Sequence, residues 1–203
     1  FVDSDVDVAV IEVGLGGRLD CTNIIDPTLC VITNISLDHM ALLGASEPEI
    51  AREKAGIIKP GVPVVIGKAD SEVREVFEST AAKLGAPIVF AGDSPYFSSA
   101  LHSGDEMIYS DTAWGELRGE LTGECQIENA ATILASLDIL RHKFSRIGSQ
   151  AVSEGFSSVC SLTGLMGRWM KIKETPVRVV CDTGHNIGGW RYLGPTLASI
   201  ADS

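Results

Sequence analysis

The chain has 203 residues, 45% of them hydrophobic and 21% charged, which is typical of a soluble globular protein large enough to bury a core. Its formal net charge of −11 argues against nonspecific nucleic-acid binding, which needs a basic surface, and no run of 18 or more apolar residues indicates a membrane span. The five scattered cysteines include no Cys-x-x-Cys pair, which favours reduced thiols in a cytosolic protein over disulfides or a zinc site.

The first predicted element is a strand over residues 6–11. This apolar run is rich in β-branched residues, which is typical of a strand buried on both faces. Glu12 follows directly. Because an unpaired charge is costly at the end of a core strand, we expect its carboxylate to be paired, hydrogen-bonded or bound to a metal. Glycines at positions 14, 16 and 17 then let the backbone approach a ligand closely.

A second apolar run, over residues 29–35, predicts the next strand, and Ser36, Leu37, Asp38 and His39 follow it. Ligands bind at the carboxyl ends of strands in open α/β sheets. If the two strands are parallel neighbours, Glu12 and His39 emerge at the same edge of the sheet and both can reach one cation. From the pattern alone, a hydrogen-bonded turn residue is the other interpretation of His39.

The glycine loop also has a second interpretation, as a dinucleotide-binding fingerprint with Asp38 as the acid that binds a ribose. Two observations count against it. Leu19 occupies the third glycine position, and residues 18–28 lack the helical period that a parallel crossover normally needs.

From residue 46 onward, helix and strand patterns alternate. Ser46 and Glu49 form a capping-box signature, and Gly56 is a stop signal for that helix. The later predicted elements are a strand over 62–66, a helix over 71–84, a strand over 87–91, an antiparallel hairpin region over 93–120, a helix over 127–140, a helix over 147–159 that breaks or ends near Gly155, and a strand over 176–181. This order predicts an α/β protein with a mostly parallel sheet flanked by helices. A glycine-containing connection over residues 162–167 predicts a boundary between domains at 1–163 and 164–203.

Three runs in this order carry a resemblance to a known family: EVGLGGRLDCTN from Glu12, TNISLDH from Thr33 and EKAGIIKPG from Glu53. Together they resemble the folylpolyglutamate synthase and dihydrofolate synthase family, within the Mur-type ATP-dependent amide ligases. The resemblance implies the central ATPase-type domain of these ligases, incomplete, followed by the start of a second Rossmann-like α/β domain.

The resemblance also implies an upstream phosphate-binding loop that is absent from this sequence. The only Gly-Lys pair, Gly67-Lys68, is followed by Ala69 and does not fit the pattern Gly-x-x-x-x-Gly-Lys-[Ser/Thr]. We therefore expect this polypeptide alone to lack ligase activity.

The activity implied by the resemblance is the joining of L-glutamate to a dihydropteroate or folate carboxylate. The carboxylate attacks the γ-phosphate of ATP to give an acyl phosphate, and the amine of glutamate then displaces phosphate. ATP and Mg²⁺ are the implied cofactors, with Mn²⁺ as a substitute for Mg²⁺, and the implied protein is a cytoplasmic monomer. Two alternatives stay open: another Mur-type ligase that adds a different amino acid, and a nucleotide-binding module without catalysis.

By the same resemblance, Glu12 and His39 bind the metal, and Lys54 and His185 are catalytic. The family's lysine in the Glu-Lys-Ala-Gly motif is carbamylated to N6-carboxylysine. A buried lysine with a lowered pKa presents the neutral amine that CO₂ needs. A cation stabilised by the dipole in the last turn of a helix is the other interpretation of Lys54. His185 and Asn186 are expected to line the cleft between the domains.

Three residues are implied to bind ATP: Asn129 at the adenine, Arg168 at the phosphates and Asp182 at the ribose. The chain departs from the family pattern nearby, because Cys125 replaces a histidine and residues 183 and 184 replace the Gly-Ala of Asp-Gly-Ala-His-Asn.

The residues that match the family's pterin-contacting loop are Leu19, Asp20 and Cys21, with Cys21 at a position where alanine is usual. A turn in which Asp20 and Asn23 cap the local backbone is the alternative interpretation.

Overall fold

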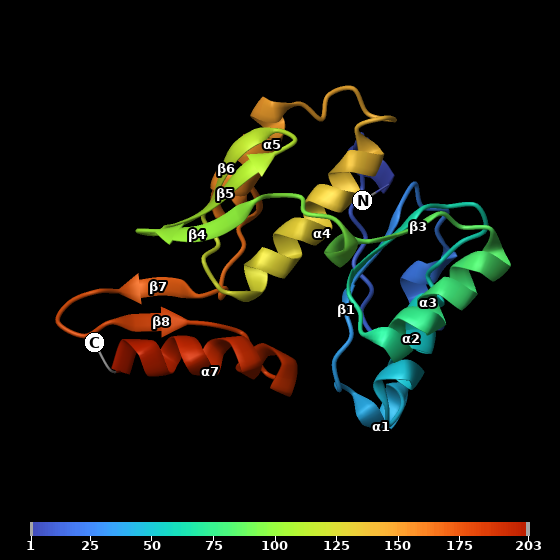
Figure 1. The fold of residues 1–203 in the computed structure, drawn as a ribbon, viewed down its shortest axis with the longest axis horizontal. Helices are drawn as coiled ribbons and strands as arrows, with labels where there is room; N and C mark the ends of the chain where they lie inside the picture. Colours follow the sequence, from blue (N-terminus) through green and yellow to red (C-terminus); the bar gives the residue numbers. More distant parts are fainter. Residues whose placement is uncertain (1, 202–203) are drawn as a thin grey trace.

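The computed structural model describes residues 2–201, and their strands form three sheets (Figure 1). The first sheet is parallel, in the order β1 (Cys30–Asn34), β2 (Val64–Lys68) and β3 (Ile88–Phe90). Val65 of the central strand lies opposite Val31 on one side and Val89 on the other. Residues 64–66 are completely buried, as expected for a parallel strand that has helices on both faces.

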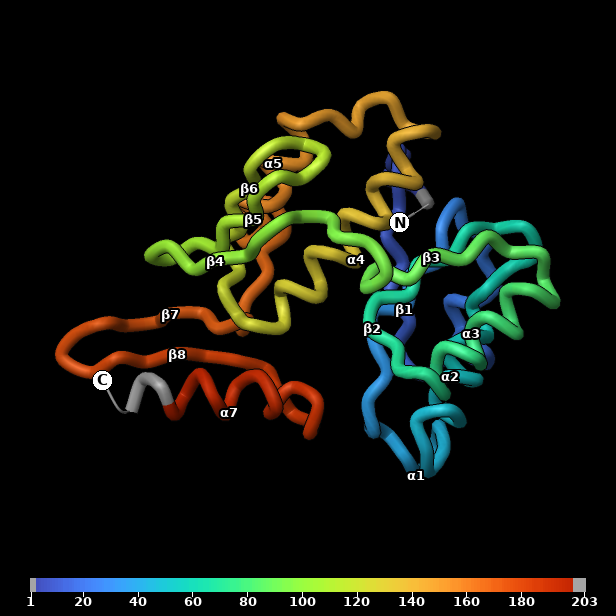
Figure 2. Tube along the Cα trace, viewed as in Figure 1, coloured from blue at the N-terminus to red at the C-terminus, as the bar shows by residue number. Residues whose placement is uncertain are grey.

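Helices α2 (Glu47–Ala55) and α3 (Ser71–Leu84) cover one face of this sheet (Figure 2). Ile66 of β2 and Phe77 of α3 are fully buried in the shared core. The Asp70 carboxylate accepts a hydrogen bond from the Val73 amide at 3.1 Å, and Gly85 ends α3 with a left-handed φ of 59°. An N-cap acceptor and a C-terminal glycine define both ends of the helix, so the predicted helix over 71–84 is confirmed.

Helix α4 (Cys125–Leu140) lies between the parallel sheet and a second, antiparallel sheet. That sheet consists of β4 (Ser99–Ser103), β5 (Glu106–Thr112) and β6 (Gly115–Gly119), which confirms the predicted hairpin region. Ala135 of α4 packs with Val65, whereas Leu134 packs with Leu117 and Val152. A helix that is apolar on two faces is suited to this interior position. Val152 belongs to α5 (Ser149–Ser157).

The remaining part of the chain forms a hairpin and a long helix. This part comprises α6 (Val159–Thr163), β7 (Met170–Lys173), β8 (Val179–Cys181) and α7 (Ile187–Ala201). Earlier in the chain there are also short elements, namely α1 (Met40–Leu43) and the 3₁₀ segments Val2–Ser4, Cys21–Ile24 and Ala91–Asp93. Strands β7 and β8 pair antiparallel. The division at residue 163, where α6 ends, and the Rossmann-like nature of the second domain stay predictions, and Ser203 lies outside the described residues.

Two expectations are corrected. Residues 6–11 form no strand, and Val8 and Val10 are 60% and 93% exposed. A strand buried on both faces needs a paired neighbour and a covering layer on each side, and the described residues supply neither for this segment. The sheet content is only partly parallel, because strands β4 to β8 pair antiparallel. The helix expected to break or end near Gly155 is α5, which ends two residues later at Ser157.

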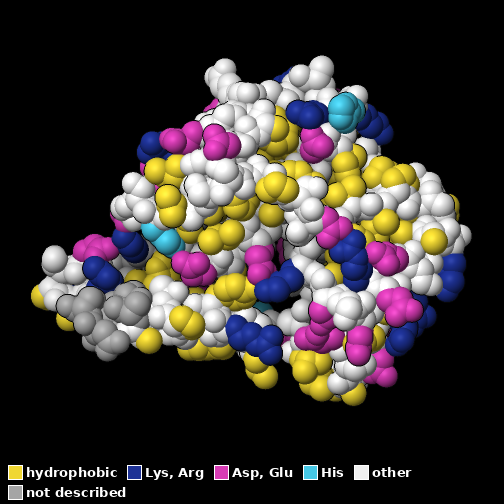
Figure 3. All heavy atoms as spheres, viewed as in Figure 1, with side chains coloured by type: hydrophobic (Ala, Val, Ile, Leu, Met, Phe, Trp, Pro, Cys, Tyr) yellow, Lys and Arg dark blue, Asp and Glu magenta, His cyan; other side chains and the backbone are white. Residues whose placement is uncertain are grey.

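The surface carries charges of both signs. On the face viewed in Figure 3, acidic and basic side chains are interspersed around α2 and α3, so the net charge of −11 is not gathered into one patch there. Within residues 2–201, no helix is both long and apolar enough to cross a membrane.

Candidate functional site

Hydrogen bonds and an ion pair connect the glycine loop and the residues that follow it to the C-terminal end of α2. Arg18 Nε donates to both carboxylate oxygens of Glu53 at 3.2 Å, and Arg18 Nη2 donates to Oε1 at 3.0 Å. The Arg18 amide also donates to the Glu53 carbonyl oxygen at 2.8 Å. Asn23 Nδ2 donates to the Gly56 carbonyl oxygen at 3.0 Å, and Lys59 Nζ donates to the Asn23 carbonyl oxygen at 2.7 Å. Two of the three runs that carry the family resemblance therefore lie against each other.

Asp20 organises the turn within that loop. Its Oδ2 accepts a hydrogen bond from the Leu15 amide at 3.0 Å, and its Oδ1 accepts from the Thr22 amide at 2.9 Å and from Thr22 Oγ1 at 2.5 Å. These bonds, first the one from the Thr22 hydroxyl, lower the pKa of Asp20 from 3.8 to about 2. Local capping by Asp20 is thus confirmed. Leu19 and Cys21 on either side are exposed, and their contact with a pterin stays a prediction.

Asp38 connects the turn after β1 to the turn before α7. Its Oδ1 accepts a hydrogen bond from the His39 amide at 2.8 Å, and its Oδ2 accepts from Asn186 Nδ2 at 2.8 Å. His185 Nε2 lies 3.5 Å from the same Oδ2. The bond from Asn186 is the main reason that the pKa of Asp38 lies below its usual value. Asp38 lies within the family run TNISLDH, beyond the carboxyl end of β1, but the sequence resemblance assigns it no role in the ligase site.

Lys54 lies in the last turn of α2 and is half-buried. Burial lowers the pKa of its ammonium group below the ordinary 10.5, while the negative charge of Asp38 opposes this shift. Among the described residues, Lys54 Nζ has no hydrogen-bond or ion-pair partner. A lowered pKa is the condition that carbamylation needs, and carbamylation itself stays a prediction.

The predicted metal residues are both accessible. Glu12 is exposed and makes no hydrogen bond or ion pair with the described residues, so of the three expected arrangements a bound metal is the one that stays a prediction. His39 has a left-handed backbone φ of 49°, and its Nε2 lies 3.8 Å from Asp38 Oδ1. The described residues hold no group of three or more His, Cys, Asp and Glu side chains placed to bind a metal. Each of the two side chains is open enough to bind a metal that takes its other ligands from phosphates and water, and their binding of one metal stays a prediction.

The predicted nucleotide residues gather around the start of α4. Arg168 Nη1 donates to Thr183 Oγ1 at 2.7 Å, and the two Asp182 oxygens accept from the Trp169 amide at 2.8 Å and the Gly184 amide at 2.7 Å. Asp182 and Arg168 also act electrostatically on Cys125 at the first position of α4, whose thiol pKa is raised chiefly by burial. Asn129 lies one helical turn beyond Cys125, and its Nδ2 donates to Gln126 Oε1 at 3.0 Å.

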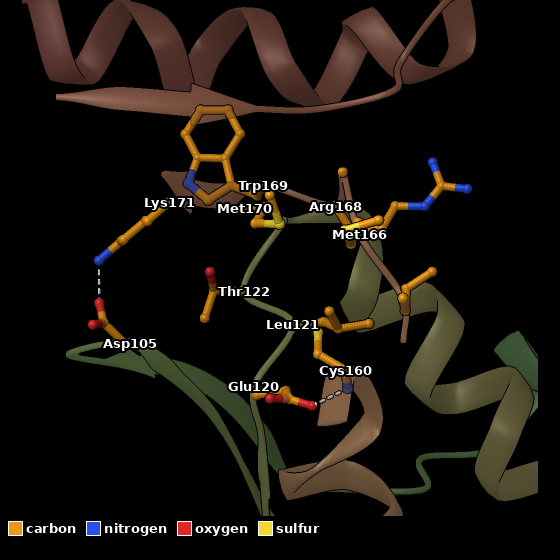
Figure 4. Close-up of a pocket in the computed structure, with 12 residues that line it drawn as sticks. Asp105, Glu120, Leu121, Thr122, Cys160, Met166, Arg168, Trp169, Met170 and Lys171 are labelled. Atoms are coloured by element: carbon orange, nitrogen blue, oxygen red, sulfur yellow. Dashed lines mark hydrogen bonds and ion pairs between the residues drawn. The ribbon is translucent and has the colours of Figure 1, made fainter. Parts of the chain in front are cut away.

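Two cavities lie near this region. The first, of about 310 Å³, lies between residues 120–122 and 165–171, and Figure 4 shows an ion pair between Lys171 and Asp105 at one end and a hydrogen bond from the Cys160 amide to Glu120 at the other. Arg168 is the only predicted site residue that lines it. The second, of about 480 Å³, lies between residues 91–97 and α4 and is lined by none of them.

Comparisons with known proteins identify the family. The Mur ligase middle domain matches residues 1–137. The dihydrofolate synthase/folylpolyglutamate synthase of Bacillus subtilis is 34% identical over 197 residues, which cover 95% of this chain and 45% of that protein. The folylpolyglutamate synthase of Mycobacterium tuberculosis complexed with ADP and AMPPCP has a TM-score of 0.81 at 32% identity, covering 98% of this chain and 45% of that one. A complex of folylpolyglutamate synthase with AMPPCP and folate has a TM-score of 0.85 at 31% identity, covering 98% and 49%.

The chain spans about half the length of the relatives that it matches. The match extends over both the parallel-sheet region and the C-terminal hairpin and helix, because it covers 98% of this chain. The chain belongs to the folylpolyglutamate synthase and dihydrofolate synthase family, and its first 137 residues match the Mur ligase middle domain.

Proposed function

We propose that the protein is an ATP-dependent ligase that joins L-glutamate to the carboxylate of dihydropteroate or of a folate. Membership of the family supports this reaction, as do the AMPPCP and folate bound in a related structure. The observation that carries the proposal is the convergence at Asp38, where the turn that holds His39 meets the turn that holds His185 and Asn186, within electrostatic reach of Lys54. Within the proposal, residues 1–163 form the central ATP-binding domain and residues 164–203 begin the glutamate-ligase domain.

In this proposal, Asn129 contacts the adenine, Asp182 the ribose and Arg168 the phosphates. The positions of the three residues favour a common ligand, since Arg168 and Asp182 both act on Cys125 and Asn129 follows one turn later on α4. Arg168 has an exposed guanidinium held by one hydrogen bond to Thr183, so most of its donors remain available to an anion.

Glu12 and His39 would hold Mg²⁺, or Mn²⁺ in its place, together with phosphate oxygens and water. A bound divalent cation would neutralise charge on the transferring phosphoryl group. The accessible carboxylate of Glu12 supports this role, because a hard cation prefers oxygen ligands and nothing in the described chain competes for that group.

Lys54 is proposed to carry a carbamate. The ammonium first loses a proton. The neutral amine then attacks CO₂, an N–C bond forms as one C=O π bond breaks, and a second proton is released, so a half-buried cation becomes an anion. The lowered pKa of Lys54 supports this step, because it raises the fraction of neutral amine. The resulting carboxylate would suit contacts with a metal or its bound waters.

The exposed side chains of Leu19 and Cys21 are proposed to contact the pterin, while Asp20 fixes the turn that presents them. The substrate carboxylate then attacks the γ-phosphate, ADP leaves, and an acyl phosphate results. The amine of glutamate attacks the acyl carbon, phosphate leaves and a proton is lost, with His185 at the cleft as the residue beside the reacting groups. Positioning and charge neutralisation supply the catalysis.

The test is ATP-dependent phosphate release by the full-length protein with L-glutamate and Mg²⁺. Dihydropteroate and tetrahydrofolate are supplied in separate reactions. Release that needs both glutamate and one of these acceptors supports the proposal and identifies the acceptor. If the folded protein binds ATP but releases no phosphate with either acceptor, the proposed reaction is wrong, and a different Mur-type ligation or a noncatalytic nucleotide-binding role takes its place.

A further inference from the structure

The two carboxylate oxygens of Asp38 accept hydrogen bonds from different segments of the chain. Oδ1 accepts from the His39 amide at 2.8 Å and so stabilises the turn after β1. Oδ2 accepts from Asn186 Nδ2 at 2.8 Å and lies 3.5 Å from His185 Nε2, in the turn before α7. Figure 2 shows this second turn facing the segment that follows β1. One side chain therefore connects two segments that are 148 residues apart.

Asn186 is held in a single orientation. Its Oδ1 accepts from the Gly189 amide in the first turn of α7 at 2.8 Å, which leaves Nδ2 to donate to Asp38. Beside this pair, the two turns pack closely: a Cβ atom placed on Gly188 would lie 3.1 Å from the Cβ of Ser36. Because the Gly189 amide fixes Oδ1 of Asn186, the side chain of Asn186 can only donate to Asp38. The carboxylate of Asp38 can only accept, so the hydrogen bond between them has one possible direction.

We propose that Asp38 is a positioning residue of the proposed ligase. It holds His185 and Asn186 beside His39, so that residues from the two halves of the site keep a fixed spacing. Asp38 acts through these neighbours and needs no contact with substrate. The kinetic part of this inference rests on the proposed function, whereas the structural part does not.

The polarity of the pair gives a direct test in the full-length protein. Asp38→Asn places an amide against the Asn186 amide, and Asn186→Asp places two carboxylates against each other. The double variant Asp38→Asn/Asn186→Asp restores one donor and one acceptor, keeps the bonds from the His39 and Gly189 amides, and leaves the net charge unchanged. Asn186→Ala removes the donor without introducing repulsion. Asp93→Asn, at an exposed carboxylate that pairs with Arg74, is the matched control.

Hydrogen exchange measured by mass spectrometry provides a readout that is independent of activity. We expect faster exchange over residues 182–190 in Asp38→Asn, Asn186→Asp and Asn186→Ala, and recovery in the double variant. In phosphate-release assays the single variants should lose kcat by up to roughly a hundredfold, with KM for ATP little changed, and the double variant should regain most of this loss. The control should match wild type in both assays.

Unchanged exchange in all three single variants would overturn the inference, and so would a double variant that recovers neither exchange nor kcat. Altered exchange with unchanged kcat would overturn the positioning role. If exchange responds as expected but the wild-type protein releases no phosphate with either acceptor, the connection through Asp38 is supported and the proposed function is wrong.

Discussion

Gly56 lies so close to Arg18 that a Cβ atom placed on it would overlap both the Cα and the Cβ of Arg18. The backbone of Gly56 has φ −62° and ψ −11°, a right-handed conformation that any residue adopts. Space, and not conformational freedom, therefore requires glycine here. The close approach accompanies the hydrogen bond from the Arg18 amide to the Glu53 carbonyl oxygen and the ion pair between their side chains.

Gly56→Ala should therefore lower the free energy of unfolding by about 2 kcal/mol, because backbone atoms must separate to admit the methyl group. Urea denaturation measures this change. The control is Gly155→Ala in α5, where no atom outside the adjoining residues and the surrounding helical backbone lies within 4 Å of the added methyl group, and the helix should gain up to about 1 kcal/mol. Equal effects of the two substitutions would show that Gly56 is not a packing requirement.

Local signals explain which parts of the fold are predictable from sequence. The ends of α3 follow from Asp70 and Gly85, and the apolar run of β2 indicates a strand covered on both faces. Residues 6–11 carry an equally strong apolar pattern but are exposed, because burial depends on neighbours in space that a local pattern does not specify.

In the candidate site, too, some features are predictable from sequence and others are not. The sequence resemblance singled out the glycine loop and the Lys54 motif, and the structure places them against each other through Arg18 and Glu53. The bond between Asp38 and Asn186 could not be predicted from spacing, since 148 residues separate them. The roles of the individual residues toward ATP, metal and pterin stay predictions.

Asp20→Asn should remove a pH-dependent part of the stability. The folded-state pKa of Asp20 is lowered from 3.8 to about 2, so this carboxylate stabilises the fold above pH 3.8, and its contribution is lost as the pH falls toward about 2. The stability difference between wild type and Asp20→Asn should therefore be largest at neutral pH and shrink over that acid range. Urea denaturation at a series of pH values measures it. A difference that does not vary with pH would contradict the assignment.

Glu12→Gln tests the proposed metal site without lowering the free energy of unfolding, because the side chain is exposed and makes no hydrogen bond with the described residues. We expect the affinity for Mn²⁺ in the presence of AMPPCP to fall by at least roughly tenfold, measured by electron paramagnetic resonance. Magnesium-dependent turnover should fall in parallel. Glu154→Gln, at an exposed position of α5, serves as the control and should bind Mn²⁺ as wild type does. Unchanged magnesium-dependent turnover in Glu12→Gln would refute the metal role.

Lys54→Arg tests the carbamate, because a guanidinium stays charged and does not react with CO₂. In wild-type protein equilibrated with ¹³C-labelled bicarbonate, we expect a carbamate carbon resonance in the NMR spectrum. Its intensity should rise with pH as the amine loses its proton, and the lowered pKa of Lys54 moves this rise below the pH at which an ordinary lysine would show it. The resonance should disappear in Lys54→Arg and persist in Lys59→Arg, whose ammonium already donates to the Asn23 carbonyl oxygen. A resonance that survives in Lys54→Arg would assign the modification to another amine and remove Lys54 from the proposed mechanism.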